Sequence, residues 1–232
     1  MLKNLFAAVG LMMASSSAIG GTGLYSPYAA SHVNFMYNLL FCDDVALFKK
    51  PDSRENAGLW KHLLTNRPDK NTLLAIADDE SNEGRIRALA YNRLRAMGAA
   101  LPKKKLLGVI VEVPLPQGLD VLAAFSEGGV RYLNQSGKVV VFEGGSTPVA
   151  QLAKELIAVS QPIVDKIGPW EEERLPPPKP GNVRITFLVS DGLYFGEGPF
   201  KVLQSDGMAG PVLSKAAQLL QKAVEPGSER DG

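Results

Sequence analysis

The hydrophobic period of the chain changes at Pro102, and this change limits the folds available to it. Before this proline, apolar residues within 24–100 recur at intervals of three and four, as on one side of an α-helix. After it, short segments rich in Val, Leu and aromatic residues are separated by turns that contain Gly or Asn, which is typical of antiparallel strands. Helices followed by a sheet-containing part predict an α+β protein.

The order of the predicted elements gives more detail. After Pro102 the strand-like segments LLGVIVEV, DVLAAFS, VRYLN and KVVVFEG follow one another, and two more strands flank Asp191. A long helix is predicted for residues 146–167, with a proline allowed after Thr147, and we expect Pro162 to kink or restart it. We therefore predict N-terminal helices packed on an antiparallel sheet of about six strands, with this inserted long helix and a C-terminal closing helix.

The same patterns predict the domain organisation. Residues 24–225 form a single α+β domain, helical over 24–100 and sheet-containing over 101–225. Residues 226–232 are polar and predict a disordered tail. The segment RLPPPKPG is interpreted as a stiff connector.

Residues 1–23 form a leader or flexible N-terminus with two interpretations. A lysine, an apolar run and small residues ending at Ala18 fit a short secretory signal, but Leu and Met at helical spacing also fit an amphipathic helix. The weak positive region favours the cytoplasm, and export to the periplasm is the alternative if residues 1–18 are a signal peptide. The apolar run is too short to span a bilayer, so we expect no transmembrane segment.

Composition narrows the classes of partner and cofactor. The chain holds 25 basic and 24 acidic residues, so no whole-molecule field favours nucleic acid, and we expect none as a partner. Cys42 is the only cysteine and there are two histidines. We expect no intrachain disulfide, no structural metal and no cofactor.

The segment NVRITFLVSDGLYFGEGPF carries a cluster of glycines that suggests either a hairpin or a phosphate loop. Alternation over residues 182–189 predicts a half-buried strand, and Asp191-Gly192 predicts a type I′ turn with positive φ at both residues. A phosphate loop needs a helix directly after the glycines and a Ser or Thr next to its lysine. Here Pro199 follows the glycines, and neither neighbour of Lys201 is a Ser or a Thr. We interpret the segment as a hairpin without a nucleotide site.

Asp43, Asp44 and Arg93 are the candidate polar site. Two adjacent carboxylates suggest a cation site or a shared proton, whereas the alternative is that they cap the segment VALF. Arg93 falls in the apolar arc of its predicted helix and needs a partner, for which one of the two aspartates is our guess. We expect Cys42 to be a buried, unreactive thiol.

The candidate interaction surface is an apolar group near the end of the predicted hairpin. It consists of Leu193, Tyr194, Phe195 and Phe200. Such a group either binds a protein partner or covers the core.

We interpret the chain as a non-enzymatic interaction or regulatory module with an unknown protein partner. It would use a sheet edge or the hairpin of residues 193–200. The alternative is a small-ligand binder or enzyme with a polar cleft that includes Asp43, Asp44 and Arg93.

Overall fold

The computed structural model of the protein describes residues 24–49 and 58–225. The predicted leader of residues 1–23 and the predicted tail of residues 226–232 lie outside the described residues.

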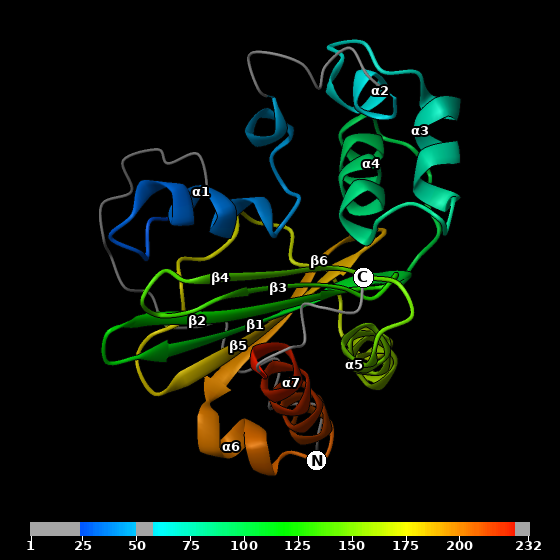
Figure 1. The fold of residues 1–232 in the computed structure, drawn as a ribbon. Coiled ribbons are helices and arrows are strands. Elements are labelled where there is room, and N and C mark those ends of the chain that lie inside the picture. Colours follow the sequence, from blue (N-terminus) through cyan, green and yellow to red (C-terminus); the bar gives the residue numbers. More distant parts are fainter. Residues whose placement is uncertain (1–23, 50–57, 226–232) are drawn as a thin grey trace.

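A six-stranded antiparallel sheet forms the centre of the protein (Figure 1), with the strand order β4-β3-β2-β1-β5-β6. The strands are β1 (Leu106–Leu115), β2 (Gly118–Phe125), β3 (Gly129–Leu133), β4 (Val139–Glu143), β5 (Asn182–Val189) and β6 (Gly192–Pro199). The first four form a meander, and the β5–β6 hairpin pairs with β1. The predicted α+β fold is therefore confirmed, and β4 and β6 are the edges of this sheet.

Helices cover both faces of the sheet (Figure 1). The N-terminal layer consists of α1 (Ser31–Leu39), the 3-10 helix η2 (Val45–Phe48), α2 (Trp60–Leu64), α3 (Lys70–Asp78) and α4 (Gly84–Ala96). The C-terminal layer consists of α5 (Pro148–Val164), α6 (Phe200–Ser205) and α7 (Ala209–Val224). Among the described residues, no helix is both long and apolar enough to cross a lipid bilayer.

Each layer shares its own hydrophobic core with one face of the sheet. Ile110 and Ala123 pack against the N-terminal layer, whereas Val109 and Ala124 pack against the C-terminal layer. All four side chains are fully buried. Successive residues of a strand point to opposite faces, so a strand that is covered on both faces has a nearly continuous apolar sequence.

The structure confirms the predicted long inserted helix, which is α5, and the predicted closing helix, which is α7. Two details differ from the prediction, one at Pro162 and one at α6. Thr147 caps α5, since its hydroxyl accepts a 3.1 Å hydrogen bond from the Ala150 N–H. Pro162 lies inside α5, which continues to Val164, so a restart at this proline was wrong. Helix α6 was not predicted, because its six residues are too few to show a helical period.

The β5–β6 hairpin forms, but the predicted type I′ turn is wrong. Gly192 pairs with Val189 as the first residue of β6, so the two-residue loop is Ser190–Asp191. Neither loop residue has a positive φ, and Gly192 also lies outside the left-handed region. The Ser190 hydroxyl donates a 2.5 Å hydrogen bond to the Pro102 carbonyl, which helps to hold the loop in ordinary backbone conformations.

Gly192 is required for a close approach. A Cβ atom at this position would lie 2.8 Å from the Cβ of Pro169, closer than carbon atoms normally come. The glycine therefore allows the segment around Pro169 to pack against the start of β6.

We predict that Gly192→Val lowers the free energy of unfolding by about 1–3 kcal/mol, because overpacking forces Pro169 and its neighbours to move. Urea unfolding followed by circular dichroism measures the change. Gly168→Val is the matched control, since a Cβ at Gly168 meets nothing within 4 Å. Equal stability of the two variants would contradict this account of Gly192.

Candidate functional site

A pocket of about 650 Å³ opens on the side of the sheet that the N-terminal layer covers. Its walls come from the loop after α1, from α4, from the β5–β6 turn and from residues 169–174. The last segment belongs to the connector, residues 165–181, which joins α5 to β5. The walls therefore come from segments far apart in the sequence.

The pocket is strongly acidic. Its lining holds six carboxylates and two guanidinium groups, although the whole chain carries a formal net charge of only +1. The carboxylates are those of Asp43, Asp44, Glu171, Glu172, Glu173 and Asp191. The guanidinium groups are those of Arg95 and Arg174. A negative surface of this kind attracts cations.

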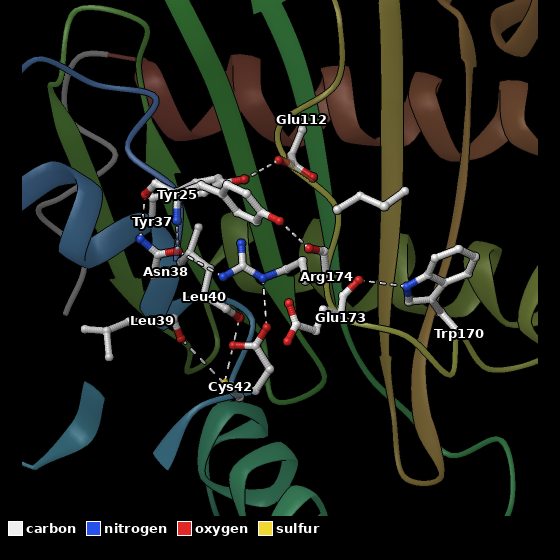
Figure 2. Close-up of polar contacts among 12 residues, drawn as sticks. Tyr25, Tyr37, Asn38, Leu39, Leu40, Cys42, Glu112, Trp170, Glu173 and Arg174 are labelled. Atoms are coloured by element: carbon white, nitrogen blue, oxygen red, sulfur yellow. Dashed lines mark hydrogen bonds and ion pairs between the residues drawn. The ribbon is translucent and has the colours of Figure 1, made fainter. Parts of the chain in front are cut away.

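Arg174 is buried between the connector and the N-terminal layer (Figure 2), and its side chain is only 5% exposed. Its Nε donates a 2.8 Å hydrogen bond to Asp43 Oδ2, and its Nη2 donates a 2.9 Å bond to Asn38 Oδ1. The guanidinium carbon lies 4.0 Å from the centre of the Phe41 ring, a cation–π contact. Arg174 thus fixes the connector to α1 and to the loop that follows it.

Trp170 holds the other end of the same segment. Its backbone N–H donates a 2.7 Å hydrogen bond to the Leu193 carbonyl, which forms an isolated β-bridge at the edge of β6. Its indole N–H donates a 2.9 Å bond to the Glu173 carbonyl, and its ring packs edge-on against Phe195 at 5.1 Å. These contacts place the indole in the pocket wall.

Further wall residues are positioned by hydrogen bonds within the protein. Asp44 caps η2, since its Oδ1 accepts a 2.8 Å bond from the Ala46 N–H, as the capping interpretation predicts. Asp191 accepts 3.1 Å bonds from the Tyr194 hydroxyl at both carboxylate oxygens. Arg95 Nη1 donates a 3.0 Å bond to the Ser190 carbonyl. These hydrogen bonds hold Asp44, Asp191 and Arg95 in the wall.

The structure brings together only part of the predicted polar site. Asp43 and Asp44 both line the pocket, but Arg93 is not among the lining residues. Arg93 Nη1 instead donates a hydrogen bond to the Leu63 carbonyl of α2. The arginine that pairs with Asp43 is Arg174, 131 positions further along the chain, which sequence reasoning missed because no local pattern connects the two.

The four residues of the candidate interaction surface do not form one patch. Tyr194 is fully buried in the core under the C-terminal layer. Leu193 packs against the core of the N-terminal layer, and Phe195 contacts Trp170. Phe200 lies in α6 and is 37% exposed.

Cys42 is buried, as expected, and burial raises the pKa of its thiol to about 12. A thiol with such a pKa remains protonated and is a poor nucleophile. His32, the histidine nearest in sequence, is exposed.

Beside Arg174 lies a second buried ionisable group, Glu112 of β1 (Figure 2), whose side chain is completely buried. The Tyr37 hydroxyl donates a 2.7 Å hydrogen bond to its Oε1. Its Oε2 accepts no hydrogen bond from the described residues, because the guanidinium of Arg184 stays 3.8 Å away and binds Glu197 at 2.5 Å. Burial therefore raises the pKa of Glu112.

Comparisons with protein-family models, with curated proteins and with solved structures found no match to this chain.

We predict that Glu112 makes the folded state less stable as the pH rises. Because the folded chain holds this proton more tightly than the unfolded chain, the free energy of unfolding falls as the pH rises above the ordinary pKa of 4.5. The slope is at most about 1.4 kcal/mol per pH unit within the affected range. Glu112→Gln removes this contribution.

The measurement is urea unfolding of the wild type and of Glu112→Gln at a series of pH values from acidic to neutral. The wild-type stability minus that of the variant should fall as the pH rises. A difference that stays constant or increases with pH would show that Glu112 is ionised in the folded protein.

Proposed function

We propose that the protein is a non-enzymatic binding module whose acidic pocket receives an extended organic cation. The observation that carries the proposal is the excess of carboxylates in the pocket of a chain that is otherwise almost neutral. A pocket of about 650 Å³ is within the usual size range of small-ligand sites, roughly 300–1,000 Å³.

The arrangement of the carboxylates favours a ligand with several separated positive charges. Glu171, Glu172 and Glu173 are consecutive and exposed along one wall, and Asp43 and Asp44 lie on another segment. Within 24–49 and 58–225, no three His, Cys, Asp or Glu side chains are grouped closely enough to hold one metal ion. The negative charge is therefore spread along the pocket, as an extended cation requires.

Trp170 supports the same class of ligand. Its indole is half-buried in the pocket wall, and the face of an indole attracts ammonium and guanidinium groups. The shared ligand chemistry is a flexible chain that carries amines or guanidinium groups. Either a free polyamine or a Lys- and Arg-rich segment of a protein partner has this chemistry.

Binding is favoured over catalysis because several polar groups of the wall already have structural partners. Asp43 is paired with Arg174, Asp44 caps η2 and Asp191 binds Tyr194. The proposal retains the interaction module inferred from the sequence but assigns the contact to the pocket instead of the 193–200 hairpin. It also retains the polar cleft of the alternative interpretation, the small-ligand binder. The arginines of this cleft are Arg95 and Arg174 instead of Arg93.

We predict that spermine or an oligolysine peptide binds the protein in isothermal titration calorimetry, and that added salt weakens the binding. Replacing Glu171, Glu172 and Glu173 together by Gln should weaken binding about 3- to 150-fold, because each of the three exposed ion pairs contributes about 0.2–1 kcal/mol. The three side chains are exposed, so the fold should not change.

The matched control replaces Glu80, Glu155 and Glu225 by Gln, which changes the net charge equally outside the pocket. Binding of spermine alone would identify a small-ligand site, and binding of the peptide alone would identify a docking site for a partner protein. If neither binds, or if the control variant weakens binding as much, the proposal is wrong.

A further inference from the structure

Strand β4 is an open edge of the sheet with an apolar sequence. It pairs with β3 on one side, and no described strand pairs with its other side. Its residues, Val-Val-Val-Phe-Glu, include no proline or lysine, the residues that often blunt an edge strand. Val141, in the middle of the strand, is 41% exposed.

The backbone groups that face outward from this edge can be assigned from the β3–β4 turn. The Asn134 N–H donates a 2.8 Å hydrogen bond to the Lys138 carbonyl, so these two residues form a hydrogen-bonded pair. Hydrogen-bonded pairs alternate with non-hydrogen-bonded pairs along an antiparallel ladder. The N–H and C=O groups of Val139, Val141 and Glu143 therefore point away from β3.

These outward groups are complementary to those of a second copy of the chain. If Val141 lies opposite Val141 of the second copy, Val139 lies opposite Glu143 of that copy. Glu143 then lies opposite Val139 of that copy. Every outward N–H and C=O of the strand then finds a partner, which gives about six hydrogen bonds. A two-fold axis perpendicular to the sheet at Val141 produces this antiparallel register and keeps each face of the sheet continuous.

The side chains fit the same register. On the face under the N-terminal layer, the two exposed Val141 side chains would meet. On the other face, Val140 would lie beside Phe142 of the second copy, and both belong to the core of the C-terminal layer. Glu143, the charged residue of β4, is bound by Arg131 at 2.7 Å, so its charge does not oppose pairing.

The opposite edge of the sheet differs. Trp170 bridges to Leu193 at one end of β6, and Pro199, which has no N–H, ends the strand. A strand added to β6 would therefore meet Trp170 at one end and a proline at the other, whereas β4 carries neither obstacle among the described residues.

We infer that β4 is a homodimer interface, through which two copies of the chain join their sheets into one continuous antiparallel sheet. The inference does not depend on a ligand in the acidic pocket, because no residue of β4 lines that pocket.

Sedimentation equilibrium of the full chain over micromolar to millimolar concentrations tests the interface. We expect a monomer–dimer equilibrium for the wild type. Val141→Lys and Val141→Glu each place two like charges opposite each other at the two-fold axis, so each should raise the dissociation constant about tenfold or more. An equimolar mixture of the two variants should restore the dimer as a heterodimer, which shows that both variants are folded.

Val202→Lys is the matched control, since Val202 is a 47% exposed valine in α6, far from β4 in the fold. It should associate like the wild type. A wild type that remains monomeric over the whole range, a Val141→Lys variant that associates like the wild type, or assembly beyond the dimer would each overturn the inference.

Discussion

The buried guanidinium of Arg174 is the interaction on which the acidic pocket depends. A buried charge is tolerated only when it is paired and hydrogen-bonded, and here the partners are the Asp43 carboxylate and the Asn38 amide. Both partners belong to α1 or the loop after it, whereas Arg174 belongs to the connector between α5 and β5. Pairing this charge therefore brings two walls of the pocket together and places Glu171, Glu172 and Glu173 along its opening.

The same region of the sheet holds further buried polar groups. Glu112, Arg184 and Glu197 lie on adjacent strands, and Tyr37 reaches down from α1 to bond Glu112. Elsewhere among the described residues, the buried polar or charged side chains are those of Arg87, Arg131, Ser160, Thr186 and Ser190. Apolar packing holds the helices to the sheet, whereas the directional contacts of Tyr37 and Arg174 fix where α1 and the connector lie on it.

Structural features that depend on a local sequence pattern could be predicted from the sequence, whereas contacts between distant segments could not. The change of period at Pro102 predicts the α+β fold, and Asp44 at the start of VALF predicts its cap. The Asp-Gly pair suggested the wrong turn, because the loop is one residue earlier and Gly192 serves a contact with Pro169 that no sequence window contains. Arg174 gave no local signal, but Glu112 did: it is the one charge in LLGVIVEV, and a charge in a central strand indicates a buried polar contact.

Hydrogen exchange followed by mass spectrometry on Arg174→Met tests most directly whether this one charge organises the pocket. Methionine keeps much of the apolar stem but removes the guanidinium group. The account predicts faster exchange of backbone amides in residues 36–44 and 169–176, with unchanged exchange in β1 to β3, and no change at all in the exposed control Lys179→Met. Unchanged protection of residues 36–44 and 169–176, or an equal loss across the whole sheet, would contradict it.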